Sequence, residues 1–301
     1  MSPRRRSLAT RVAPAAILAA LLATGGWLAA APSASTTGAT HAAVPGDGAT
    51  DRPILPVGTL GGPHHALSPV EEITFRAGRA LFDRSFHKSH GLGSPEFNAD
   101  SCRACHQDPV LGGAGDLDLN VFRAANDNGG AGPFVDLAGG QAYSKLRPPY
   151  VPGREEVPAG QGDVFEQRQT PALFGTGLIN QIAEVEIQSN EDPSDSDMDG
   201  IFGVARIVLV NGIPEVGRFG WKAQLPRLGD FTRDALANEC GITAPPDGRG
   251  FTLVSDPDPV ADPEMPLGDV NDLTAFIGLL APPPRGGAGS DPIVMQGETL
   301  F

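Results

Sequence analysis

The feature that most constrains this chain is the short stretch Ser101-Cys102-Arg103-Ala104-Cys105-His106. Two cysteines separated by two residues, with a histidine directly after the second, form the c-type haem attachment pattern. The thiols form thioether bonds to the two vinyl groups of a porphyrin, and the histidine then lies under the iron as its proximal ligand. The pattern therefore predicts haem c attached through Cys102 and Cys105 and ligated by His106.

Two other uses of such cysteines fit the sequence less well. A structural zinc site needs about four Cys or His ligands, and the remaining cysteine, Cys240, has no paired neighbour. A thioredoxin-like pair is expected at a strand-to-helix junction, whereas the polar run 97–100 precedes Cys102. Cys240 itself is expected to stay buried or to pair with a cysteine outside this sequence.

The N-terminus has the pattern of a secretory signal peptide, which we assign to residues 1–34. Arg4, Arg5 and Arg6 precede the alanine-rich apolar run 13–31, and small residues follow it. An uncleaved anchor is the alternative, because the run approaches the ~20 residues of a membrane span. Gly25-Gly26 interrupts the run and favours cleavage, so we expect no stable membrane span. The expected location is periplasmic or otherwise extracytoplasmic, which also suits a haem attachment motif.

The charge of the chain restricts its partners. The formal net charge is −14 at pH 7, which disfavours nucleic acid and anionic membrane surfaces as partners. A redox partner protein or a small electron donor remains compatible. The 39 glycines and 29 prolines predict a loop-rich body with short helices.

The sequence indicates a mainly α-helical, cytochrome c-like haem domain over residues 67–284, with a large insertion at 110–260 and a flexible leader at 35–66. The leader contains His64 and His65, which we expect to be solvated. The first helix is predicted to begin at Ser68, with Pro69 at its first position and Glu71 completing a capping box. Its expected apolar face consists of Val70, Ile73, Ala77, Ala80 and Leu81.

A second helix is predicted after Met265-Pro266. Its apolar positions are Val270, Leu273, Phe276, Ile277 and Leu280, and Pro282-Pro283-Pro284 ends it. This resembles the last helix of cytochrome c domains, where a preceding Met-Pro segment commonly provides the distal haem ligand. Met265 is thus a candidate distal ligand; His87, His90 and an open sixth position are the alternatives.

The insertion carries two local signals. Residues 206–219 around Asn211-Gly212 predict a β-hairpin with a type I′ turn, whereas residues 112–162 are Gly/Pro-rich and are expected to be irregular. Just before the hairpin, Asp195, Asp197 and Asp199, with Asp192 nearby, resemble the start of a calcium loop. A complete EF-hand is excluded because Arg206 stands where the bidentate glutamate belongs. A partial Ca²⁺ site and a solvated turn remain the two interpretations.

The end of the chain repeats its beginning. Gly297-Glu298-Thr299-Leu300-Phe301 matches the Gly-x-x-Leu-Phe pattern of Gly78 to Phe82. In the first copy a haem motif follows the phenylalanine. We therefore interpret residues 285–301 as a linker and the start of a second cytochrome c-like domain, truncated before its haem motif.

Several blocks in order resemble the di-haem oxidoreductase family of c-type cytochromes, whose members are described as peroxidase-like and are also labelled thiol oxidoreductases. The blocks are residues 91–98, Arg168-Gln169-Thr170-Pro171, residues 173–179, the Asp-rich loop, residues 217–223 and residues 279–283. The resemblance implies two haem domains, hence a second haem in a full-length version, and leaves it in doubt whether this chain alone is active. It also suggests Arg168, Arg218 and Lys222 as propionate or inter-haem contacts and Trp221 as an electron relay, although each is equally compatible with a structural role.

Three functions compete on this basis. The first is an exported redox enzyme of the di-haem peroxidase type, which needs an open or displaceable sixth iron site. The second is a non-catalytic electron-transfer cytochrome with His106 and Met265 as axial ligands. The third is a haem-free thiol–disulfide protein that uses Cys102 and Cys105.

Overall fold

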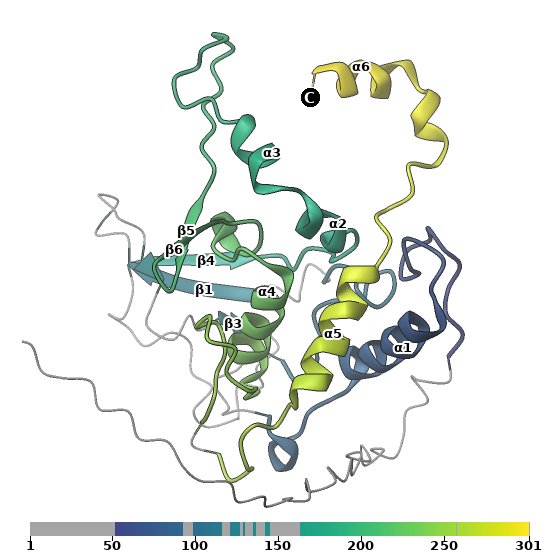
Figure 1. Cartoon of the computed structure of the whole chain (residues 1–301), viewed down its shortest axis with the longest axis vertical. Coiled ribbons are helices and arrows are strands. Elements are labelled where there is room, and N and C mark those ends of the chain that lie inside the picture. Colours follow the sequence, from purple (N-terminus) through teal and green to yellow (C-terminus); the bar gives the residue numbers. More distant parts are fainter. Residues whose placement is uncertain are drawn as a thin grey trace, which may run out of the picture. The chain divides into compact units, whose positions relative to one another are not determined.

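The computed structural model describes residues 52–92, 99–115, 121–126, 129, 135–136, 142–144, 163–256 and 258–300 (Figure 1). The signal peptide and the part of the leader before residue 52 lie outside these ranges. The described chain is mainly helical and includes a two-stranded antiparallel hairpin. Its α-helices are α1 (Pro69–Asp83), α2 (Thr176–Gln181), α3 (Glu184–Ser189), α4 (Leu228–Ala235), α5 (Leu267–Leu279) and α6 (Pro292–Leu300). Shorter helical turns are η1 (Lys88–His90), η3 (Trp221–Ala223), η4 (Leu236–Cys240) and η5 (Gly286–Ser290).

The centre of the fold is the crossing of α1 and α5, which lie side by side (Figure 1). Gly78 permits this crossing, because a Cβ there would approach the carbonyl oxygen of Asp272 to 2.0 Å. Phe276 of α5 packs edge-on against Phe75 and Phe82 of α1, with ring centroids 5.0 and 5.3 Å apart. The two helices predicted to form the haem domain thus share one aromatic core.

Both helix predictions hold, with one correction. The capping box is present: Ser68 Oγ accepts from the Glu71 amide at 3.3 Å, and Glu71 Oε2 accepts from the Ser68 amide at 2.8 Å. The predicted apolar face of α1 is wrong, because Val70 and Ile73 are 72% and 70% exposed. The buried face is instead formed by Phe75, Gly78, Arg79, Phe82 and Asp83. The aromatic side chains bury more apolar area than the β-branched ones, and they set the rotation of the helix.

On α5 the predicted apolar positions Val270, Leu273, Phe276, Ile277 and Leu280 are all at most 4% exposed. Residues 52–66, expected to belong to a flexible leader, are instead bonded to the end of this helix. The His64 amide donates to the Leu279 carbonyl at 2.9 Å, and the Ala281 amide donates to the Gly62 carbonyl at 2.8 Å. The ordered body therefore begins before the predicted boundary.

The hairpin consists of β5 (Ile207–Val210) and β6 (Ile213–Val216), paired antiparallel from Ile207 opposite Val216 to Val210 opposite Ile213. Asn211 and Gly212 have φ values of 52° and 80°. Positive φ at both turn positions is the type I′ geometry, which confirms the prediction.

A second sheet has three strands within the stretch expected to be irregular and a fourth just after it. Its strands are β1 (Val121–Asn126), β2 (Val135–Asp136), β3 (Ala142–Ser144) and β4 (Val164–Arg168). Strand β1 pairs antiparallel with each of the other three. These strands are short and their pairing is non-local, so the Gly/Pro-rich composition concealed them. Within the described ranges, no helix combines the length and the apolar character needed to span a membrane.

Candidate functional site

The haem-motif residues form a tight turn that is fixed to the end of α1. The Arg103 amide donates to the Phe82 carbonyl at 3.1 Å, and the His106 amide donates to the Cys102 carbonyl at 3.0 Å. The guanidinium of Arg103 bonds the fully buried carboxylate of Asp83, with Nη1 2.7 Å from Oδ1. The turn between two cysteines and a histidine is thus held by helix α1 on one side.

His106 is half-buried, and its ring contacts a backbone carbonyl. Its Nδ1 lies 3.1 Å from the carbonyl oxygen of Gly113. When Nδ1 carries the ring proton it donates to this carbonyl, and Nε2 keeps a lone pair for a metal. Burial lowers the pKa of His106 to about 4, although the carbonyls of Gly113 and Pro171 oppose the shift. The imidazole is therefore neutral at pH 7, as metal ligation requires.

The two motif cysteines are poor candidates for thiol redox chemistry. Burial raises the pKa of Cys102 to about 12, with a further contribution from Cys105. Burial also raises the pKa of Cys105 to about 12, with a smaller contribution from Glu239. Because the thiolate is the reactive form and reactive cysteines have lowered pKa values, this environment argues against a thiol–disulfide protein.

One cavity of about 550 Å³ collects Cys102, Cys105 and His106 in its wall. Phe82, Leu273 and Ile277 line it from the crossed helices α1 and α5. A further part of its wall comes from α4 and from η4, a single turn of π-helix that continues α4. The volume falls within the 300–1,000 Å³ range of small-molecule and cofactor sites.

The lining of this cavity fits a haem group. The donor set is two sulfurs and an imidazole at the attachment spacing, surrounded by mostly apolar side chains such as Leu173, Phe231 and Leu236. Apart from the neighbouring Cys105 thiol, the buried Oγ1 of Thr170 has no hydrogen-bond partner in the described structure. A buried hydroxyl without a partner is uncommon in native proteins, and this one belongs to the cavity wall.

Two acidic residues in the wall, Asp234 and Glu239, were not singled out at the level of the sequence, whereas Gln169 and Cys240, which also line it, were. Glu239 is tied to the haem motif, because its carbonyl accepts from the Ala99 amide at 3.0 Å. Cys240 is 3% exposed and burial raises its pKa, so it is buried as expected. No sequence motif marks Asp234 or Glu239; tertiary packing of α4 and η4 brings them to the cavity.

The candidate distal ligands do not line the cavity. Met265 is 2% exposed and belongs to the apolar core, but it is not among the described lining residues. His87 and His90 are exposed and face each other with ring centroids 6.1 Å apart. Among the lining residues that the structure describes, His106 is the one histidine, and methionine is absent. Ligation by Met265 stays a prediction that this arrangement does not favour.

The suggested propionate and relay residues are dispersed. The side chain of Arg218 is 8% exposed and bonds the backbone: Nη1 donates to the carbonyls of Val216 and Pro226, and Nη2 donates to that of Ile182. Arg168 ends β4, with its backbone opposite Val121. Lys222 is exposed, and Trp221 and Lys222 belong to η3, directly after the cavity-lining Gly220. The side chains of Arg168 and Trp221 lie outside the described part.

The acidic loop brings carboxylates together, although not the predicted three. Carboxylate oxygens of Asp192, Asp195 and Asp197 lie within 4.8 Å of one another. Asp199 is not in this group; its Oδ1 accepts from the Ile201 amide at 2.8 Å. Calcium binding by the loop stays a prediction, with Asp192 taking the place of Asp199.

Comparison with known proteins adds no relative, because no family model, curated protein or solved structure matches the chain. The class of this protein therefore has to be inferred from the cavity and its residues.

Proposed function

We propose that this chain is an exported c-type haem protein with redox activity of the di-haem peroxidase type. The observation that carries the proposal is the apolar cavity that holds Cys102, Cys105 and His106 together. Covalently bound haem supplies a one-electron redox centre and, where its sixth coordination position is open, a site for peroxide.

The chain's own residues support this assignment in three ways. Cys102 and Cys105 lie on the turn that carries His106, so attachment and ligation come from one rigid segment. Gly113 orients the imidazole through Nδ1. The wall formed by α4 and η4 contributes Phe231 and Leu236 as apolar groups and Asp234 and Glu239 as polar groups.

The wall also bears on the choice between an enzyme and an electron carrier. A carrier of the His/Met type needs a second strong ligand opposite His106. The described lining includes no methionine and no second histidine. This favours an accessible distal position, and hence the peroxidase-like alternative over the carrier.

The test is to express the chain with an export signal and the haem-maturation machinery and to record optical spectra. We expect one covalent haem per chain in the pyridine derivative, a high-spin component in the ferric spectrum, and carbon monoxide binding after reduction. Met265→Leu is expected to leave these spectra unchanged. Absence of covalent haem would refute the assignment, and a low-spin spectrum that ignores both peroxide and carbon monoxide would establish the carrier instead.

A further inference from the structure

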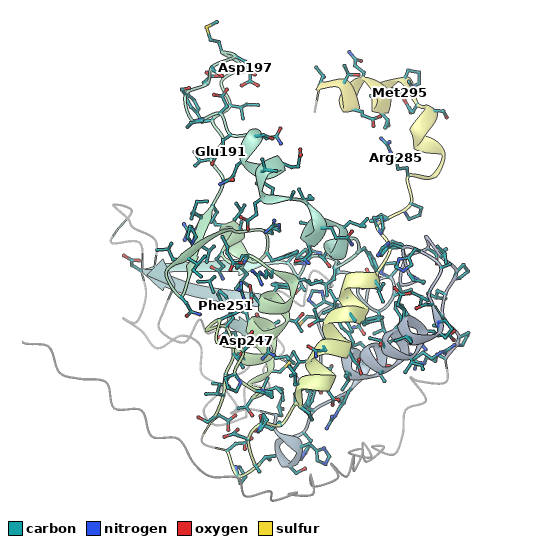
Figure 2. The ribbon with its side chains drawn as sticks, in the orientation of Figure 1. Glu191, Asp197, Asp247, Phe251, Arg285 and Met295 are labelled. Atoms are coloured by element: carbon teal, nitrogen blue, oxygen red, sulfur yellow. The ribbon has the colours of Figure 1, made fainter. Side chains whose placement is uncertain are left out.

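Residues 178–205 form an extension that we call the acidic arm. It includes the end of α2, helix α3 and the aspartate-rich loop. Its two limbs are paired: the Asp192 amide donates to the Gly203 carbonyl at 2.9 Å, and the Gly203 amide donates to the Asp192 carbonyl at 3.1 Å. Glu191 Oε1 also accepts from the Ala205 amide at 2.7 Å. Figure 2 shows Glu191 near the start of the loop and Asp197 near its far end.

The arm has regular hydrogen bonding but buries none of its own residues. Val185, Met198, Ile201, Phe202 and Val204 are between 65% and 86% exposed. Scattered exposed apolar residues are normal in a protein, but a cluster of large ones on one segment marks a contact surface. The apolar side chains of the arm are therefore available to a partner.

The charge of the arm narrows the kind of partner. It contains seven carboxylates, namely Glu184, Glu186, Glu191, Asp192, Asp195, Asp197 and Asp199, and no lysine or arginine. A second copy of this chain, with its net charge of −14, would meet like charge, which opposes association. Anionic lipid surfaces are disfavoured for the same reason. Only a basic partner complements both the charge and the apolar side chains.

The base of the arm is bonded to the segment that flanks the cavity. Arg218 Nη2 donates to the Ile182 carbonyl at 2.8 Å, and Asn180 Oδ1 accepts from the Leu228 amide at 2.8 Å. Along the chain, Gly220 lies between Arg218 and Leu228, and Phe231 follows Leu228. Both Gly220 and Phe231 line the cavity. A protein docked on the arm thus rests on a segment continuous with the wall of the redox site.

We infer that the acidic arm is the docking surface for a basic electron-transfer protein with an apolar contact patch. The inference that the partner transfers electrons depends on the proposed haem function. The inference that the partner is basic and has an apolar contact patch depends only on the charge and the exposed side chains of the arm.

The experiment uses mitochondrial cytochrome c as a basic probe and measures its dissociation constant for the haem-loaded chain by calorimetry. We expect binding at low ionic strength and about tenfold weaker binding near 0.2 M salt, because exposed charge pairs are screened. The arm variant Phe202→Ser/Val204→Ser is expected to bind at least about tenfold more weakly, equivalent to about 1.4 kcal/mol. Glu186→Lys is expected to weaken binding in the same direction.

The matched control is Val70→Ser/Ile73→Ser, which alters two equally exposed apolar residues on α1 and should leave the dissociation constant unchanged. Absence of binding, or an arm variant that binds like the control, would overturn the inference. Light scattering that reveals a dimer lost in the arm variant would assign the arm to a second copy instead. If haem did not attach but the probe still bound in an arm-dependent way, the proposed function would be refuted and the docking surface would be confirmed.

Discussion

Two glycines occupy the same position in a repeated sequence pattern, but their surroundings in the structure differ: one is crowded by a second helix and the other is open. Gly78 and Gly297 each begin a Gly-x-x-Leu-Phe stretch. A Cβ on Gly78 would come within 2.0 Å of the Asp272 carbonyl and 2.7 Å of Phe276 Cβ, whereas a Cβ on Gly297 would meet nothing within 4 Å. The pattern alone therefore does not say whether a glycine permits a helix crossing.

Gly78→Ala is expected to lower the free energy of unfolding by about 3 kcal/mol, because the crowded atom is backbone and the α1–α5 crossing must open. Gly297→Ala is expected to be neutral or to stabilise α6 by roughly 0.5 kcal/mol, since alanine is the better helix former. Urea unfolding of both variants measures the difference. Equal effects at the two positions would show that the close crossing does not exist in solution.

At the scale of elements, the stability of the N-terminal turn of α1 depends on the negative charge of Glu71. The Glu71 carboxylate accepts from the Ser68 amide at 2.8 Å and lies 3.1 Å from His65 Nε2. The bond from the Ser68 backbone, followed by the Ser68 and His65 side chains, lowers the pKa of Glu71 from 4.5 to about 2. The ionised form is therefore favoured in the folded state.

Because the folded state lowers this pKa, the stabilisation is complete above pH 4.5 and is lost as the pH falls toward 2. Glu71→Gln keeps a hydrogen-bonding side chain but removes the charge, so its unfolding free energy should fall less over this window than that of the unaltered protein. Glu72→Gln, which removes a carboxylate paired only with Arg76 on the helix surface, serves as the control. Parallel pH curves for all three proteins would rule out a role for the Glu71 charge.

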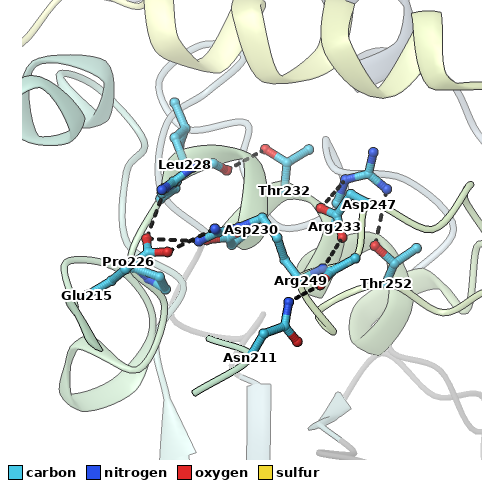
Figure 3. Close-up of polar contacts among 12 residues, drawn as sticks. Asn211, Glu215, Pro226, Leu228, Asp230, Thr232, Arg233, Asp247, Arg249 and Thr252 are labelled. Carbon is cyan, nitrogen blue, oxygen red and sulfur yellow. Dashed lines mark hydrogen bonds and ion pairs between the residues drawn. The ribbon is translucent and has the colours of Figure 1, made fainter. Parts of the chain in front are cut away.

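At the scale of the whole molecule, one arginine joins the hairpin to the cavity wall. Arg249 forks onto Asp230 of α4, with distances of 2.6 and 2.8 Å, and onto Glu215 of β6, with distances of 2.9 and 3.0 Å (Figure 3). Asp230 is 2% exposed. The adjacent residue Phe231 lines the cavity, so this ion-pair network positions the part of the cavity wall that α4 forms.

Arg249→Ala is expected to cost roughly 3 kcal/mol, because it leaves a buried carboxylate without its partner. Arg227→Ala removes the exposed guanidinium that also bonds Glu215 and is expected to cost less than about 1 kcal/mol. Chemical denaturation measures both. If the two variants were equally stable, the network would not hold α4 in place.

Short-range sequence signals were sufficient to predict the elements whose structure depends on neighbouring residues. The capping box at Ser68, the turn at Asn211-Gly212 and the apolar face of α5 are each decided within a few residues of backbone. The spacing of Cys102, Cys105 and His106 is also local, so the prediction of haem attachment there depends on one turn of the chain.

Tertiary packing decided the rest, because it depends on which surfaces meet across long separations. It rotated α1 to bury Phe75 and Phe82 rather than Val70 and Ile73. It paired β1 with the distant strand β4, with Val121 opposite Arg168. It also carried Glu239 and Cys240 to the cavity while leaving Met265 in the apolar core. The sequence by itself determined the turn from Cys102 to His106 and predicted it as a site of haem attachment. Only tertiary packing decided which side chains share the cavity with this turn, since non-local contacts leave no fixed spacing in a sequence.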